Sequence, residues 1–119
     1  MIESIISMEL PAGGHLAIRR NRICPEQETK QCRRISLVSG IHGDELEGQY
    51  ICYETARRVK EHPEYLKGIV DIYPALNPLG IDMASRTVPR LDMDMNRMFP
   101  GDASGDMMER ITAAVVDSI

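Results

Sequence analysis

The chain has 119 residues and a mass of 13.4 kDa, and its 18 Asp and Glu outweigh 14 Lys and Arg for a formal charge of −4. This length accommodates one domain or part of one. The acidic balance argues against nucleic acid, because binding it needs a basic surface. The apolar runs are too short to span a bilayer, while 43% hydrophobic residues suffice for a globular core. We therefore expect neither a nucleic-acid nor a membrane partner.

The three cysteines, Cys24, Cys32 and Cys52, stand at irregular spacing. An odd number without a Cys-x-x-Cys pair predicts neither a disulfide framework nor a cysteine zinc site. A reduced, cytoplasmic protein is the expectation. Cys52 is expected on the buried face of a helix, where cysteine packs as a small hydrophobe.

The sequence pattern of residues 1–73 predicts four strands and one helix. The strands are expected over 2–8, 15–23, 34–39 and 68–73. The helix is expected over 45–60, with a buried stripe of Ile51, Cys52, Thr55, Ala56 and Val59. A strand, a four-turn helix and another strand indicate a βαβ crossover in a largely parallel sheet.

Residues 74–105 show no sustained period and are rich in Pro, Gly and charge, so they predict a long ordered loop. Within it, Asn77-Pro78 is typical of a turn. A second helix is expected over 106–119, capped by Ser104 or Asp106. Its carboxyl end has no Gly, Pro or basic residue nearby. With few strands for two helices, we expect a truncated three-layer α/β fold: a mostly parallel or mixed sheet with helices on both faces.

A candidate site lies in Gly40-Ile41-His42-Gly43-Asp44-Glu45, between a predicted strand and the predicted helix. His42 and Glu45 can both point into the crevice at the carboxyl end of the sheet, where α/β proteins bind ligands. An imidazole and a carboxylate form part of a catalytic zinc site, which has three protein ligands and a water. The alternative is a His–Glu pair that merely caps the helix or lies on the surface.

A second charged segment runs from Arg86 to Arg97 and contains three arginines, two aspartates and an Asn-Arg pair. Guanidinium groups bind carboxylates in bidentate fashion, so this segment suits an anionic substrate or a developing oxyanion. The alternative is a surface loop whose arginines pair with its own aspartates.

Three motifs in order, GIHGDELEG (40–48), PALNPLG (74–80) and DMDMNRMFPG (92–101), resemble the succinylglutamate desuccinylase/aspartoacylase family of zinc carboxypeptidase-like enzymes. The resemblance covers about residue 34 onward. It implies a zinc-dependent hydrolase that cleaves the amide bond of an N-acyl amino acid or a related small molecule. Zn²⁺ is the implied cofactor, and a small anionic N-acylated compound is the implied substrate.

The resemblance also implies residue roles. His42 and Glu45 would be two of three zinc ligands, and Asn96 with Arg97 would hold the substrate carboxylate. Arg86, with Arg90 as the alternative, would polarise the scissile carbonyl. The guanidinium of Arg97 is expected to face the same hollow as His42 and Glu45.

The family's third ligand, a histidine, has no match in this chain, because His15 and His62 stand at the wrong positions. The family's glutamate general base is also unmatched. The chain is therefore expected to be the N-terminal part of one catalytic domain, to hold half of an active site and to be inactive alone. We expect it to self-associate or to pair with the remaining part. A carboxypeptidase or peptide amidase of the same superfamily, and a non-catalytic binding or assembly module, are the alternatives.

Overall fold

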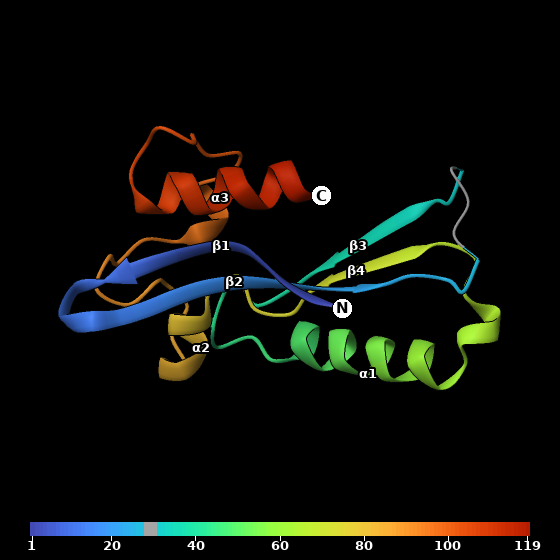
Figure 1. Ribbon diagram of the computed structural model, residues 1–119. Coiled ribbons are helices and arrows are strands. Elements are labelled where there is room, and N and C mark those ends of the chain that lie inside the picture. The colour runs from blue at the N-terminus through green and yellow to red at the C-terminus, as the bar shows by residue number, and fades with distance from the viewer. Residues whose placement is uncertain (28–30) are drawn as a thin grey trace.

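The computed structural model describes residues 1–27 and 31–119, which form one four-stranded mixed sheet with helices on both faces (Figure 1). The strands are β1 (Ile2–Leu10), β2 (Gly14–Ile23), β3 (Arg34–Val38) and β4 (Ile69–Tyr73). The helices are α1 (Glu47–Glu61), α2 (Pro78–Met83) and α3 (Met107–Ser118). Short 3-10 helices cover Pro11–Gly13, Pro63–Tyr65 and Met95–Arg97.

The strand order in the sheet is β1-β2-β4-β3. β1 and β2 form an antiparallel hairpin, β2 also pairs antiparallel with β4, and β3 runs parallel to β4. α1 connects β3 to β4, as the predicted βαβ unit requires. β4 is buried along most of its length because it has a strand on each side and helices on each face.

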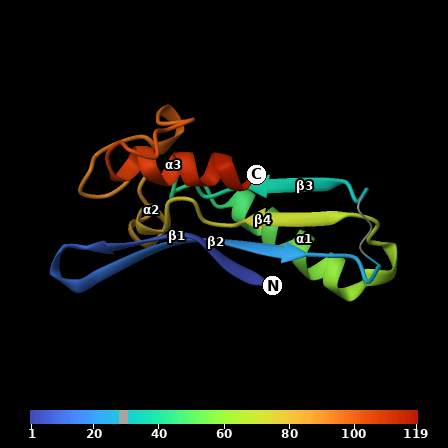
Figure 2. The same ribbon diagram turned by 45° about the horizontal axis from the view of Figure 1, so that its top comes forward.

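Two apolar clusters fill the space between the sheet and its helices. Figure 1 shows α1 and α2 on one face of the sheet and α3 on the other, and Figure 2 shows that α3 ends beside β3. The cluster toward α1 contains Cys52, Val70 and Ile72, so Cys52 is buried as expected. The larger cluster joins the hairpin, β4 and α3 to the segment after α2, and consists of Leu16, Ile18, Tyr73, Leu76, Val88, Met95, Met108, Ile111 and Val115.

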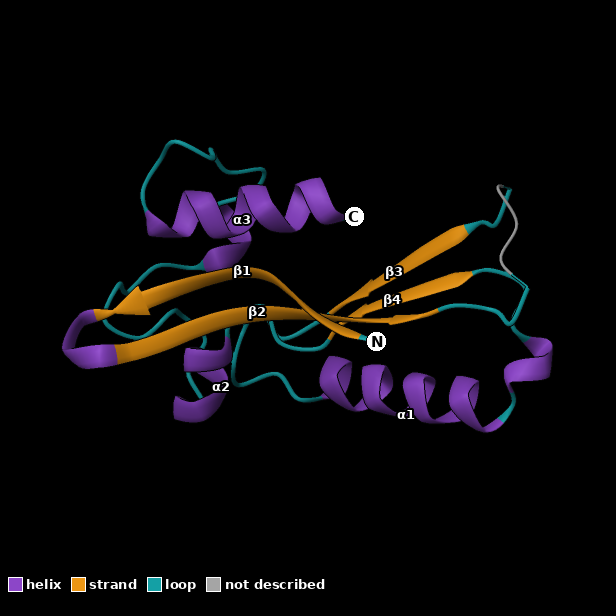
Figure 3. Cartoon of the chain, in the orientation of Figure 1, coloured by secondary structure: helices purple, strands orange, loops and turns teal. Residues whose placement is uncertain are grey.

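The segment 74–105 differs from the predicted loop, because Pro78–Met83 forms α2 (Figure 3). Asn77 caps this helix by accepting a bond from Gly80 N, and proline occupies the first turn, where its missing N–H costs nothing. The prediction of ordinary turn chemistry at Asn77-Pro78 was therefore wrong. The rest of the segment is ordered by Val88 and Met95, both buried in the larger cluster.

α1 begins at Glu47 rather than at residue 45, with Leu46 at its N-cap. Its predicted buried stripe was wrong at Ile51, which is 57% exposed because Cys52 instead faces the sheet. In α3, the candidate cap is Asp106, which forms a reciprocal capping box with Glu109. Among the described helices, none is long and apolar enough to cross a membrane.

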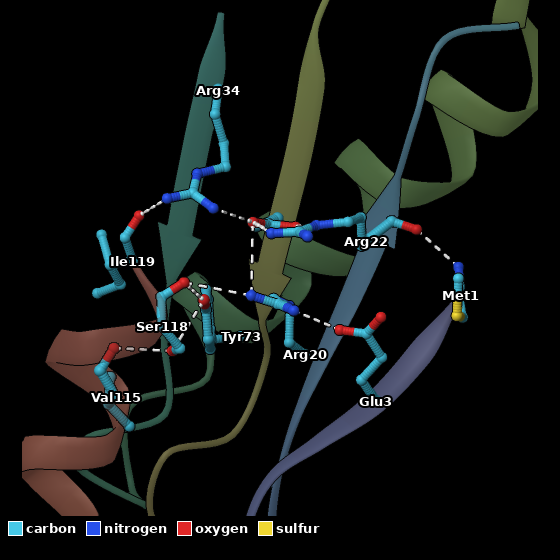
Figure 4. A network of polar contacts seen from close by, with 10 residues as sticks. Met1, Glu3, Arg20, Arg22, Arg34, Tyr73, Val115, Ser118 and Ile119 are labelled. Carbon is cyan, nitrogen blue, oxygen red and sulfur yellow. Dashed lines mark hydrogen bonds and ion pairs between the residues drawn. The ribbon is translucent and has the colours of Figure 1, made fainter. Parts of the chain in front are cut away.

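The carboxyl end of α3 is bound by side chains from the sheet (Figure 4). The Tyr73 hydroxyl and the Arg20 guanidinium donate to Ser118 O, and Arg34 donates to Ile119 O. Within the helix end itself, the Ser118 hydroxyl donates to Val115 O at 2.8 Å. The donors Tyr73, Arg20 and Arg34 lie on strands at least 45 positions away, so no local sequence pattern could indicate them.

The same arginines surround a buried carboxylate on β4. Arg22 donates two bonds of 2.7 Å to Asp71, and guanidinium nitrogens of Arg20 and Arg34 each lie 3.9 Å from it. Burial alone would raise the pKa of the Asp71 carboxyl, but the bonds from Arg22 and the three cationic charges hold that pKa below its usual value. A cavity of about 550 Å³ opens beside these arginines and the end of α3.

Candidate functional site

A left-handed turn after β3 carries the first candidate residues. Gly40 has a φ of +70°, and a Cβ there would lie 2.9 Å from Ala75 Cα, so glycine suits both the conformation and the contact. Gly43 is closer still to its neighbour, because a Cβ would lie 2.0 Å from the carbonyl carbon of Gly80 in α2. The turn is thus packed backbone to backbone against α2, and His42 lies between these two glycines.

His42 joins two carboxylates from different segments. Its Nδ1 lies 3.2 Å from Glu45 Oε1, and its Nε2 lies 2.9 Å from Asp94 Oδ1. The His42 side chain is 10% exposed, whereas the Glu45 side chain is largely exposed. The sequence-predicted pair therefore converges, and Asp94 joins it from 52 residues away.

The charge on Asp94 determines which imidazole nitrogen carries the proton. The hydrogen bond with His42, the backbone N–H of Asn96 and the charge of Arg86 hold the pKa of the Asp94 carboxyl below its usual value. An ionised carboxylate only accepts hydrogen bonds, so Nε2–H of His42 is the donor. In the neutral ring, Nδ1 then presents a lone pair to Glu45, and two such acceptors at 3.2 Å require a proton or a cation between them.

Arg86 lies beside the same group and Arg90 does not contact it. A guanidinium nitrogen of Arg86 is 3.4 Å from Glu45 Oε1 and another is 3.8 Å from Asp94 Oδ2. Arg90 is an exposed residue with φ of 71° in the tight turn closed by the bridge between Val88 and Met93.

Asn96 and Arg97 stand on the 3-10 helix Met95–Arg97, directly after Asp94. Both residues are exposed. Asp94 accepts a bond from Asn96 N at 3.0 Å, which fixes the start of this helix beside His42. Within the described ranges 1–27 and 31–119, the Arg97 side chain forms no hydrogen bond or ion pair with the His42 group, so its expected orientation stays a prediction.

A cavity of about 300 Å³ lies at the carboxyl end of β3, and its lining includes His42, Glu45, Ser39 and Glu47. It is smaller than the cavity beside the arginines around Asp71, whose guanidinium groups are already engaged. The smaller cavity is the one at the sheet edge where α/β proteins bind ligands.

The donor set at His42 and Glu45 fits two positions of a zinc site. Ligand atoms about 2.1 Å from a tetrahedral zinc lie roughly 3.4 Å apart, close to the 3.2 Å between Nδ1 and Oε1. Asp94 then occupies the place of the carboxylate that commonly orients a metal-binding histidine through its other nitrogen. The sequence analysis gave Asp94 no role at the site, because 52 residues separate it from His42.

The described part of the chain contains no group of three His, Cys, Asp or Glu arranged to hold a metal ion. His15 bonds Ser7 on the hairpin, and His62 bonds Glu64 after α1. Neither histidine contacts His42. The residues that the structure brings together are thus a pair of candidate ligands, an orienting carboxylate and one arginine.

Sequence comparison assigns the chain to a known family. Residues 31–118 match the succinylglutamate desuccinylase/aspartoacylase catalytic domain, and the chain therefore belongs to the succinylglutamate desuccinylase/aspartoacylase family. A curated relative, the N-alpha-acetyl-L-2,4-diaminobutyric acid deacetylase of Halomonas elongata, is 36% identical over 75 residues, which are 63% of this chain and 21% of that protein.

Solved structures share the fold. A succinylglutamate desuccinylase/aspartoacylase from Rhodobacter sphaeroides is 32% identical with a TM-score of 0.73, over 90% of this chain and 30% of that one. The product-bound ectoine utilization protein EutE (DoeB) from Ruegeria pomeroyi is 28% identical with a TM-score of 0.73, over 91% and 32%. The chain thus spans about a fifth of the curated relative and about a third of these structures.

Proposed function

We propose that this chain is the N-terminal part of a cytoplasmic, zinc-dependent hydrolase that cleaves the amide bond of a small N-acylated amino acid. The observation that carries the proposal is the convergence of His42 and Glu45, with Asp94 on the second imidazole nitrogen. Family membership supports the reaction class, because its catalytic domain is named for a desuccinylase and an acylase and a relative is a deacetylase.

In this proposal His42 Nδ1 and Glu45 Oε1 hold Zn²⁺, and a histidine from another stretch of polypeptide supplies the third protein ligand. Bound zinc lowers the pKa of a coordinated water and polarises a carbonyl oxygen. Asp94 keeps the proton of the His42 ring on Nε2, which leaves Nδ1 free to bind the metal.

Three residues bind and orient the substrate in the proposed reaction. Arg86 is the residue that polarises the scissile carbonyl, and its contacts with Glu45 and Asp94 support it over Arg90. Asn96 and Arg97 hold the substrate carboxylate, which their exposure beside Asp94 permits. Fixing the carboxylate orients the amide for attack.

We further propose that the 119-residue chain is inactive until a second polypeptide completes the site. β3 is an edge of the sheet, and its Ile35 and Val38 side chains are 58% and 39% exposed. An open apolar edge favours pairing with another strand. A polypeptide matching the remainder of the relatives would cover this edge, and self-association of the chain is the competing outcome.

The test of the metal site uses the 119-residue chain and measures zinc affinity by competition with a chelator. His42→Ala and Glu45→Gln are each expected to weaken Zn²⁺ binding at least tenfold. Asp44→Asn is the matched control, because Asp44 is an exposed neighbour that does not line the cavity. Equal affinity in all four proteins would contradict the proposed ligands.

The test of the activity mixes the chain with a polypeptide covering the rest of the Halomonas relative. Release of acetate from N-acetyl-L-2,4-diaminobutyrate is expected from the mixture and not from either part alone. Arg86→Ala should abolish most of this activity and Arg90→Ala should not. A mixture that binds zinc, forms a complex and releases no acetate would favour a non-catalytic module.

A further inference from the structure

Asn77 connects three segments beneath the candidate site. It precedes α2, its side chain is 1% exposed, and its Oδ1 accepts a bond of 2.8 Å from Gly80 N. Its Nδ2 donates to Ile41 O at 3.3 Å and to Thr87 O at 3.2 Å. These two carbonyls belong to the residues that directly precede His42 and follow Arg86.

We propose that Asn77 is a positioning residue, whose carboxamide holds the turn carrying His42 and the loop carrying Arg86 at a fixed separation. This inference rests on the proposed function. It adds to it a buried residue that contacts neither metal nor substrate and acts through the backbone on both sides of the site.

The hydrogen-bonding pattern explains why asparagine occupies this position. Serine and aspartate also cap helices, but neither presents an acceptor together with two N–H donors. Loss of the donors would leave two partly buried carbonyl groups without these partners, which is costly. The cap and the two links therefore need one carboxamide with a fixed orientation.

The glycine at residue 80 leaves the room that this carboxamide occupies. A Cβ on Gly80 would lie 2.2 Å from Asn77 Nδ2, so a side chain at residue 80 would displace it. Parallel backbone bonds reinforce the arrangement, since Asn77 N donates to Gly40 O and Gly43 N donates to Ser85 O, each at 2.8 Å. The two loops are thus linked around α2, and Nδ2 is the side-chain link shared by both.

The experiment compares Asn77→Asp with the unchanged 119-residue chain. Aspartate retains the acceptor that caps α2 and removes both donors. Val70→Ala is the control, because Val70 is buried in the cluster with Cys52 and Ile72, apart from these loops. Zinc affinity is expected to fall about tenfold or more in Asn77→Asp and to stay within twofold in Val70→Ala.

Equal affinity in Asn77→Asp and the unchanged chain would overturn the inference, as would an equal loss in both variants. If the unchanged chain binds no zinc, the proposed function fails, and side-chain NMR signals decide the inference separately. Signals of His42 and Arg86 should then shift in Asn77→Asp and remain in place in Val70→Ala. If these signals behaved alike in the two variants, the inference about Asn77 would be overturned.

If Asn77→Asp does not fold, the unchanged chain still provides a direct measurement. The Nδ2 protons of Asn77 should exchange slowly with solvent and show nuclear Overhauser contacts to both Ile41 and Thr87. Rapid exchange, or contacts to one segment only, would rule out a carboxamide that links the two loops.

Discussion

His42 Nε2 lies 2.9 Å from Asp94 Oδ1, so a residue after β3 is bonded to one from the segment that follows α2. The bond has two consequences for the site. It places the protonated nitrogen away from Glu45, and it ties the exposed Asn96-Arg97 pair to the buried imidazole through a single aspartate. A charged hydrogen bond thus links the proposed zinc ligand His42 to the segment that carries the proposed substrate-binding residues.

Asp94→Asn should weaken zinc binding by about 10–100-fold while leaving the fold intact. The amide keeps the shape of the side chain but loses the charge that favours the proton on Nε2 of His42. Chelator competition measures the affinity. Asp92→Asn is the matched control, because Asp92 is exposed, has a φ of 50° that asparagine accommodates, and does not contact His42. Equal losses in both variants would contradict an orienting role for Asp94.

Asp71→Asn should lower the free energy of unfolding at pH 7 by about 3 kcal/mol, because it leaves the partly buried Arg22 without its anionic partner. Urea unfolding followed by circular dichroism measures the change. Glu54→Gln, in an exposed ion pair with Arg57, is the control and should have a small effect. Similar losses in the two variants would refute the special contribution of the buried carboxylate.

The ion pair between Asp71 and Arg22 also predicts how the free energy of unfolding changes in acid. The folded-state pKa of Asp71 lies below its ordinary value, so its stabilisation is complete above about pH 4. The contribution is lost as the pH falls through the folded-state pKa. The difference in unfolding free energy between the unchanged chain and Asp71→Asn should therefore be constant from pH 7 to 5 and shrink toward pH 2. A difference that grows on acidification would contradict this sign.

Gly43→Ala should destabilise the chain by about 1–3 kcal/mol and weaken zinc binding, because the new methyl group would collide with the Gly80 backbone. Ala84→Gly is a control at the other end of α2. Ala84 has a φ of 49°, where glycine is favoured, so this change should raise the unfolding free energy by up to about 1 kcal/mol. Thermal unfolding measures the stability of the two variants, and metal titration measures their zinc affinity. Unaltered zinc affinity in Gly43→Ala would contradict the proposed dependence of the metal site on this turn.

Ile35→Lys should reduce any self-association of the chain, since a charge on an edge strand discourages pairing with another strand. Sedimentation velocity at several concentrations gives the distribution of species. Ile51→Lys is the comparison, because Ile51 is about equally exposed but lies on α1. If Ile51→Lys alone dissociated the assembly, α1 and not β3 would form the interface.

Sequence patterns predicted the elements whose cause is local. The strands and the two longer helices follow from alternation, periodicity and breakers, and the His42–Glu45 pair follows from a strand–turn–helix junction. α2 was missed although Asn77 and Pro78 are a cap and a first-turn proline, because six residues are too few to show a period. The contacts of Asp94 with His42, and of Arg20 and Arg34 with the end of α3, join distant segments, so no local pattern could reveal them.

The position of β4 between β2 and β3 has a consequence for biosynthesis. The middle strand of this group is the last to emerge from the ribosome, so the inner sides of β2 and β3 lack their partner until β4 has emerged. Pairing between segments this far apart in sequence is slow relative to local structure. The guanidinium groups of Arg22 and Arg34 also await Asp71 during that interval, so the nascent chain lacks the carboxylate that lies between them in the folded sheet.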